Sequence, residues 1–205
     1  MTDAAFWDRR ARKYAKQPIS NMTAYEKTLE RARAHLKPTD RVAEMGCGTG
    51  TTALLLAPSV REYTGLDVSE EMIQIATEKL DAAPMDGVEF RVAQAATPPD
   101  DLVDLDAVLS FNLYHLVPNW RRAIATAGSR VRPGGLFITK TPCLEGKVLI
   151  RMFVWIMRVA RQAPHVEFFS VDQFEKAIKD AGFQIIETGF YPDNSRSRFV
   201  VARKM

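Results

Sequence analysis

A glycine-rich turn in the first quarter of the chain constrains the fold more than any other stretch. Gly46, Gly48 and Gly50 alternate between a short β-type run at 41–45 and a helix-forming run at 51–57. Glycine takes positive φ without a steric penalty and leaves bare backbone for a ligand to touch. A strand, a glycine turn and a helix in this order predict a ligand-binding βα unit of an α/β protein.

The spacing of these glycines argues against two phosphate-binding motifs. Gly-x-Gly-x-Gly differs from the Gly-x-Gly-x-x-Gly that seats a dinucleotide pyrophosphate, and no Lys-Ser or Lys-Thr pair follows, as a P-loop requires. Glu44, two residues before the first glycine, would repel phosphate and attract an ammonium group. Asp67 ends a second β-type run at 62–66, where an acid accepts hydrogen bonds from ribose hydroxyls. The pattern favours a nucleoside ligand that carries positive charge.

The glycine turn and the two acids resemble the S-adenosylmethionine site of class I, Rossmann-like methyltransferases of the small-molecule or lipid type. The resemblance implies S-adenosylmethionine as cofactor, S-adenosylhomocysteine as product, and a binding set that consists of Glu44, Gly46, Cys47, Gly48, Gly50, Asp67, Val68, Gln94 and Asn112. Gln94 departs from the family, which usually has an acid there to bind the adenine amino group. A glutamine carbonyl can also accept a hydrogen bond from that amine.

The rest of the chain alternates strand and helix patterns. Further β-type runs are expected at 88–92, 106–111, 136–141, 184–190 and 198–201. Helical runs are expected at 69–82, 120–131 and 171–181. By analogy with the family, the fold is a three-layer αβα sandwich around a seven-stranded, mostly parallel sheet of order 3-2-1-4-5-7-6, with strand seven antiparallel. No repeat or second domain is evident, so residues 1–205 are predicted to form one domain.

Two helical segments precede the first strand. Residues 3–17 place three aromatic residues along one side of a helix, Phe6, Trp7 and Tyr14. A second helix at 22–36 is predicted to bury Met22, Tyr25, Leu29, Ala32 and Leu36. The resemblance implies that residues 1–37 form a lid over the cofactor. The alternative is that the aromatic residues only anchor a terminal helix to the core.

The loop after the fourth strand, 112–115, is expected beside the methyl acceptor, because ligands bind at the carboxyl ends of parallel strands. Methyl transfer from a sulfonium is an in-line displacement that depends mainly on alignment, with a general base where the acceptor must lose a proton. The candidate bases are His115, Tyr114 and Tyr14; a purely structural His115 is the alternative. No Asn-Pro-Pro-Tyr or Asp-Pro-Pro-Tyr signature stands here, so methylation of nucleic-acid amines is not expected.

A helical insertion at 143–170 interrupts the alternation. Within 148–160 only Arg151 and Arg158 are charged, and with Lys147 and Arg161 they form one narrow stripe. A helix this apolar is buried, self-associated or in contact with lipid, and residues 148–161 would reach only ~21 Å, too short to cross a bilayer. We predict a cap over a lipophilic acceptor or a peripheral membrane contact. The alternative is a homodimer interface formed by 147–162.

Composition narrows the class of protein. The chain is 46% hydrophobic and 26% charged, as in soluble globular proteins, and its net charge of +3 is too small to argue for a nucleic-acid partner. Cys47 and Cys143 form neither a metal-ligand spacing nor a disulfide framework, so no metal is expected. No signal peptide is recognisable at the N-terminus, which favours a cytoplasmic protein.

The sequence therefore predicts an enzyme that transfers a methyl group from S-adenosylmethionine to a small, lipophilic acceptor. Two other hypotheses remain. A non-catalytic S-adenosylmethionine-binding protein is supported only by Gln94. A nicotinamide-dependent Rossmann oxidoreductase is disfavoured by the glycine spacing and by Glu44.

Overall fold

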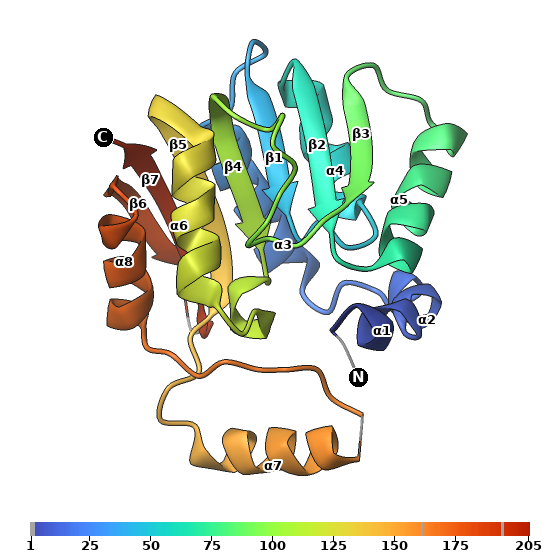
Figure 1. Cartoon of the computed structure of the whole chain (residues 1–205), viewed down its shortest axis with the longest axis vertical. Coiled ribbons are helices and arrows are strands. Elements are labelled where there is room, and N and C mark those ends of the chain that lie inside the picture. Colours follow the sequence, from blue (N-terminus) through green and yellow to red (C-terminus); the bar gives the residue numbers. More distant parts are fainter. Residues whose placement is uncertain (1–2, 161, 194) are drawn as a thin grey trace.

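Seven strands form one sheet in the order β3-β2-β1-β4-β5-β7-β6, which confirms the predicted topology (Figure 1). The computed structural model describes residues 3–160, 162–193 and 195–205. Strands β1 to β5 are parallel, and β7 runs antiparallel to both β5 and β6. The strands are β1 (Arg41–Met45), β2 (Glu62–Asp67), β3 (Val88–Val92), β4 (Leu105–Phe111), β5 (Val131–Pro142), β6 (Phe183–Phe190) and β7 (Ser197–Lys204).

Helices cover both faces of this sheet. α6 (Trp120–Arg130) and α8 (Val171–Asp180) share one core with Val108 of β4. α3 (Met22–Arg33) and α4 (Thr51–Leu56) share the other core with Ala107 and Leu109 of the same strand. Successive strand residues point to opposite faces, so a strand between two helical layers reads as one continuous apolar run.

The remaining helices are short or lie at the edges. They are α1 (Asp3–Asp8), α2 (Ala11–Ala15), η1 (Ala57–Ser59), α5 (Glu70–Ala82), η2 (Tyr114–Leu116) and α7 (Val148–Val159). Ser69 caps α5 as its sequence indicates, because its side chain accepts a hydrogen bond from the backbone N–H of Met72 at 3.1 Å. Among the described residues, no helix is long and apolar enough to cross a membrane.

The N-terminal segment differs from the single helix predicted at 3–17, because the chain turns between α1 and α2. The turn follows Asp8, whose Oδ1 accepts hydrogen bonds from Ser69 Oγ at 2.6 Å and from the backbone N–H of Glu71 at 3.3 Å. A carboxylate at the start of α5 complements the helix dipole. The break therefore lets Asp8 hold the N-terminal segment to the sheet domain.

Helix α3 ends at Arg33, three residues short of its predicted end, and its buried face is shifted. Met22, predicted to be buried, is 51% exposed, while Thr28 is buried. Thr28 tolerates burial because its hydroxyl donates to the backbone carbonyl of Ala24 at 2.8 Å. Strand β5 begins at Val131 rather than at the predicted residue 136, so the Pro-Gly-Gly stretch at 133–135 lies within the strand.

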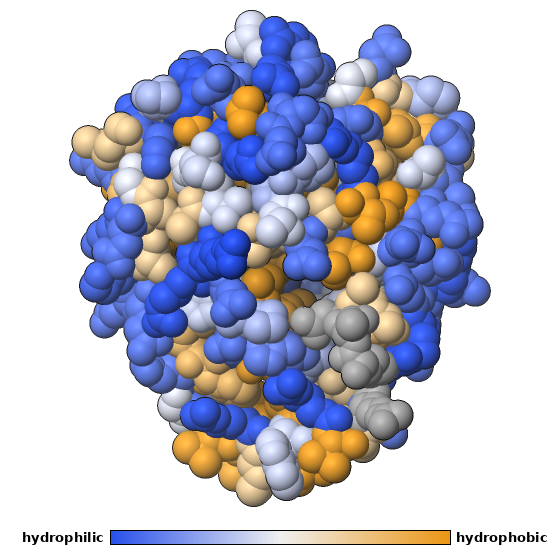
Figure 2. Space-filling model, viewed as in Figure 1, coloured by the Kyte–Doolittle hydropathy of each residue, from blue (hydrophilic) through white to orange (hydrophobic). Residues whose placement is uncertain are grey.

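Helix α7 stands apart from the rest of the molecule, at the end of the sheet where the parallel strands finish (Figure 1). None of its described side chains is buried. Figure 2 shows hydrophobic surface interleaved with hydrophilic residues at this edge of the molecule. Arg161, which the predicted basic stripe includes, lies outside the described residues.

Candidate active site

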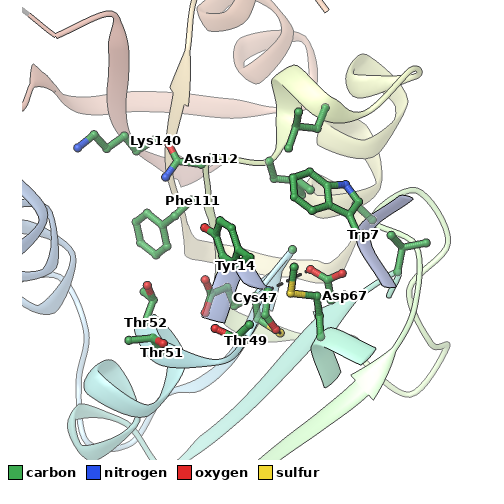
Figure 3. Close-up of a pocket in the computed structure, with 18 of the residues that line it drawn as sticks. Trp7, Tyr14, Cys47, Thr49, Thr51, Thr52, Asp67, Phe111, Asn112 and Lys140 are labelled. Atoms are coloured by element: carbon green, nitrogen blue, oxygen red, sulfur yellow. Dashed lines mark hydrogen bonds between the residues drawn. The ribbon is translucent and has the colours of Figure 1, made fainter. Parts of the chain in front are cut away.

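A cavity of about 980 Å³ lies at the carboxyl ends of β1, β2 and β4, and the N-terminal segment forms part of its wall. Among the described residues, its lining includes two acids, Glu44 and Asp67, and one base, Lys140. Figure 3 places Lys140 and Phe111 on one side of the cavity, and Asp67 and Trp7 on the other. The two acids and the lysine therefore mark different regions of one site.

The glycine turn supplies part of the cavity wall. Gly46 and Gly48 line it, with φ of +72° and +54°. A Cβ on Gly48 would meet no atom within 4 Å, so its backbone is open to a ligand. Gly50 does not line the cavity: it starts α4 at φ +73°, and a Cβ there would lie 2.8 Å from Phe90. Gly50 shapes the turn, so its predicted direct contact with cofactor is not supported.

Asp67 links the glycine turn to the start of α5. Its carboxylate accepts hydrogen bonds from the backbone N–H groups of Gly48 and Ser69, each at 3.0 Å. Burial raises the pKa of Asp67 above its usual value, and these two donors oppose the shift. Asp67 also lines the cavity, where it is placed to accept hydrogen bonds from a ligand.

Glu44 is the more deeply buried acid, 1% exposed at the end of β1. The hydroxyl of Tyr63 donates to its Oε2 at 2.8 Å. Burial raises the pKa of Glu44 to about 8, and the negative charge of Asp67 adds to this shift. A positively charged ligand group would restore the ionised form. The site thus fits a nucleoside with an ammonium or sulfonium group.

Replacing Glu44 with glutamine is expected to stabilise the ligand-free protein at alkaline pH. Between the ordinary glutamate pKa of 4.5 and the raised value of about 8, Glu44 is neutral in the folded chain and ionised in the unfolded chain. Stability therefore falls across this window as pH rises. Glutamine does not ionise, and it retains an acceptor for Tyr63. The melting temperature of Glu44→Gln relative to the parent should rise by about 5 °C or more between pH ~5 and ~8.5.

Thermal unfolding followed by circular dichroism measures this difference. Glu26→Gln, a change of the same kind on the exposed face of α3, is the control and should leave the pH dependence unaltered. If the melting temperatures of Glu44→Gln and the parent change with pH in the same way, Glu44 is not held in its neutral form.

The three candidate bases occupy different environments. Tyr14 lines the cavity. Tyr114 is wholly buried between Phe137 and Phe174, with ring centroids 5.9 and 6.0 Å away, and does not line the cavity. Burial raises the pKa of Tyr114 further from neutrality. Its position does not fit a catalytic role, because its hydroxyl has no access to a ligand.

His115 is also absent from the cavity wall. Its Nδ1 lies 3.4 Å from Thr141 Oγ1, and its backbone carbonyl accepts from the N–H of Glu167 at 2.7 Å. Burial lowers the pKa of His115 to about 4. A weakly basic side chain that lies beside Thr141 of β5 and outside the cavity wall supports the structural alternative for His115.

Other predicted residues do lie at the cavity. Cys47, Val68, Gln94 and Asn112 all line it. Asn112 adopts φ +57°, and its N–H donates to the backbone carbonyl of Lys140 at 2.7 Å. Lys140 itself was not among the predicted site residues. Its signal is a lone charged residue within the otherwise uncharged run 136–142, at the carboxyl end of a strand.

The N-terminal segment contributes aromatic side chains to the cavity wall. Trp7 and Tyr14 both line it, and their rings meet edge to face with centroids 6.3 Å apart. The segment has more anchors than its aromatic residues, because Arg12 forms ion pairs with Glu71 and Glu78 on α5. These pairs are solvent-exposed, so each contributes little.

The sheet order, the glycine turn and the two acids at the carboxyl ends of β1 and β2 define the fold of a class I, Rossmann-like methyltransferase. Residues 8–188 match a family model described as a methyltransferase domain. The chain belongs to this family. The nicotinamide hypothesis has no support from this match.

Similar proteins include named methyltransferases. The chain is 25% identical to a magnesium-protoporphyrin O-methyltransferase of Rhodobacter capsulatus over 74% of its length and 68% of the relative. It is 35% identical to a fatty-acid O-methyltransferase of Mycolicibacterium smegmatis over 48% of its length, a match that spans only 35% of that protein. Magnesium protoporphyrin IX methyltransferase from Synechocystis, solved with bound S-adenosylhomocysteine, superposes with a TM-score of 0.75 at 18% identity. The superposition covers 98% of this chain and 98% of that chain.

Proposed function

We propose that this protein transfers a methyl group from S-adenosylmethionine to a small, lipophilic acceptor. One observation carries the proposal: one cavity is lined by the glycine turn and two acids, the buried Glu44 and the half-buried Asp67, and also by the apolar residues Phe111 and Leu29. The first group of residues suits a cationic nucleoside and the second an apolar acceptor.

Each cofactor contact is proposed from the position of the residue. Asp67 accepts hydrogen bonds from the ribose hydroxyls, and Glu44 pairs with the positively charged part of the cofactor. Gln94 and Val68 also line the cavity, and the adenine would bind beside them. S-adenosylmethionine supplies a methyl group on a positively charged sulfur. Asn112, on the carboxyl side of β4, lies where donor and acceptor would meet.

The protein contributes mainly by alignment. An in-line transfer needs the acceptor atom ~3 Å from the methyl carbon, and no side chain has to form a covalent bond. The N-terminal segment, through Trp7 and Tyr14, would exclude water once ligands are bound. Of the three candidate bases, only Tyr14 is placed to act on a ligand.

The relatives support the nature of the acceptor. The names of two of them refer to a porphyrin and to fatty acids, both largely apolar molecules that carry acid groups. The names of these relatives support the proposal and do not carry it. One relative is only 25% identical, and the other matches only 48% of the chain.

Helix α7 is proposed to bind an anionic lipid surface from which a lipophilic acceptor is taken. Seven of its large apolar side chains, Phe153 and Trp155 among them, have exposed fractions between 50 and 77%. Lys147 precedes the helix, Arg151 and Arg158 lie within it, and it contains no acid. Apolar side chains with basic residues and no acids suit the interface of a negatively charged membrane.

Binding of S-adenosylhomocysteine tests the proposed function directly. Calorimetry should show binding of S-adenosylhomocysteine and none of NAD. Transfer of a labelled methyl group from S-adenosylmethionine to any member of a lipophilic acceptor panel then separates an enzyme from a non-catalytic binding protein. Binding of NAD in preference to S-adenosylhomocysteine would overturn the proposal.

Tryptic cleavage after Lys13 or Lys16 is expected to slow when S-adenosylhomocysteine is added. Trp7, Tyr14 and Gln17 line the cavity, so a bound cofactor adds contacts to the N-terminal segment. If only the closed form binds ligand, cleavage slows by 1 + [L]/Kd, about tenfold at ten times Kd. Gel electrophoresis over time measures the rate, with Asp67→Ala as the ligand-deficient control. Equal rates with and without ligand in the parent would count against a lid.

A further inference from the structure

We propose that Lys140 binds the carboxylate of the methyl acceptor, and that the acceptor is therefore an apolar carboxylic acid methylated on oxygen. This inference rests on the proposed methyltransferase function and adds to it a substrate class and a specificity-determining residue. It starts from the acids and bases that line the cavity: among the described residues these are two acids in one region and one lysine in another.

Among the described residues, the ammonium of Lys140 has only neutral partners. It donates to Thr28 Oγ1 at 2.8 Å and to the backbone carbonyl of Tyr191 at 3.0 Å. A lysine ammonium has three donors, so one remains for a ligand. No carboxylate of the described residues lies within salt-bridge distance of it. Because a partly buried cation without a counter-charge is costly, its presence in a cavity wall indicates an anionic ligand.

Neighbouring cations are arranged differently. Arg31, one turn beyond Thr28 on α3, pairs with Glu187 at 2.6 Å. Arg198, on β7 beside β5, pairs with Glu175 at 2.8 Å. Both belong to structural ion pairs and neither lines the cavity. Lys140 therefore differs from the nearby cations both in its exposure to the cavity and in its lack of an acid partner.

Apolar side chains lie in the same cavity wall as Lys140. Phe111 is its neighbour on β4, and Leu29 and Ile19 line the same cavity. A molecule that satisfies both features has a hydrocarbon part and an anionic head. Burial lowers the pKa of Lys140, and a bound carboxylate would oppose that shift.

Carboxylate chemistry also agrees with the absence of His115 and Tyr114 from the cavity wall. A carboxylic acid with a pKa of about 4 is already ionised at neutral pH and needs no general base. One carboxylate oxygen forms the new bond to the methyl carbon while the carbon–sulfur bond breaks and its electron pair stays on sulfur. A methyl ester and a neutral thioether result, and no proton moves. The second oxygen can remain hydrogen-bonded to Lys140.

A matched set of ten-carbon probes tests this inference: decanoate, decanol and decylammonium. Each probe is titrated by calorimetry into the protein saturated with S-adenosylhomocysteine. The probe concentration stays below the concentration at which that probe forms micelles. Decanoate should bind about 10- to 100-fold more tightly than decanol, the range expected for a hydrogen-bonded charge, and decylammonium more weakly still.

Lys140→Met should remove the preference for decanoate over decanol and leave S-adenosylhomocysteine affinity unchanged. Lys140→Arg keeps the positive charge and should retain most of the preference for decanoate. Arg31→Met removes a neighbouring cation outside the cavity and should not alter decanoate binding. These variants separate an anion site from a lysine that only joins α3 to the segment after β6.

Three results would be decisive. Equal binding of decanoate and decanol to the parent protein, or an unchanged preference in Lys140→Met, overturns the inference and leaves the proposed function standing. Failure of the parent to bind S-adenosylhomocysteine overturns the proposed function itself. The comparison of the three probes on the parent decides the inference even if the lysine variants do not fold.

Discussion

Asp67→Ala is expected to weaken S-adenosylhomocysteine binding by about 5- to 150-fold. The change removes the acceptor proposed for the ribose hydroxyls, and each buried polar group left without a partner costs ~1–3 kcal/mol. Asp67 also accepts from the backbone N–H groups of Gly48 and Ser69, so the turn itself loses two bonds. Calorimetry with the parent and the variant under the same buffer gives the ratio.

Two controls make the result specific. Asp67→Asn keeps one side-chain oxygen as an acceptor and should lose less affinity than Asp67→Ala. Asp101→Ala removes an exposed acid that pairs with Arg91 and does not line the cavity, so it should bind as the parent does. If Asp67→Ala folds, by its circular dichroism and melting curve, and still binds as tightly as the parent, the site assignment is wrong.

Local rules predicted most of the fold. The run from Arg41 to the glycine turn, the cap at Ser69 and the apolar run of β4 each specify their element by neighbouring residues alone. The strand order came from family resemblance rather than from these patterns. Cavity residues on strand ends, such as Glu44 and Asp67, were predictable because the carboxyl ends of parallel strands meet at one edge.

Side-chain direction could not be predicted in the same way. Asn112 and Leu113 line the cavity, but the short helix η2 turns the next two rings away from it. Tyr114 enters the core beside Phe174, a contact set by the packing of α8 rather than by local sequence. Lys140 became visible as a site residue only when α3 and the segment after β6 were placed around it.

Helix α7 shows a different limit. Its composition predicted an apolar helix that needs a partner surface. In the structure its apolar side chains are exposed, so the described residues of the chain do not supply that surface. The predicted cap over the acceptor is not formed here, since no α7 residue lines the cavity. No described residue of the chain buries the helix. The proposed occupant of its apolar surface is an anionic lipid surface.

Phe153→Ser/Trp155→Ser is expected to reduce binding to phosphatidylglycerol vesicles by about 100-fold. Burial of a large aromatic side chain contributes at least ~1.5 kcal/mol, and two such losses add to about two decades in affinity. Both residues are more than 60% exposed, so their replacement should not disturb the core. Vesicle sedimentation measures the bound fraction. Phosphatidylcholine vesicles, which lack net charge, should bind the parent less tightly because Arg151 and Arg158 gain nothing there.

A matched variant and a measurement of mass complete the test. Leu55→Ser/Val103→Ser changes two exposed apolar residues outside α7 and should leave vesicle binding unaltered. Light scattering distinguishes the other occupant, a second copy of the chain. A parent protein that is dimeric and ignores vesicles, together with a monomeric Phe153→Ser/Trp155→Ser variant, would make α7 a dimer interface. That result would remove the support that α7 gives to a lipophilic acceptor, while the anion site at Lys140, which depends on other residues, would still stand on its own test.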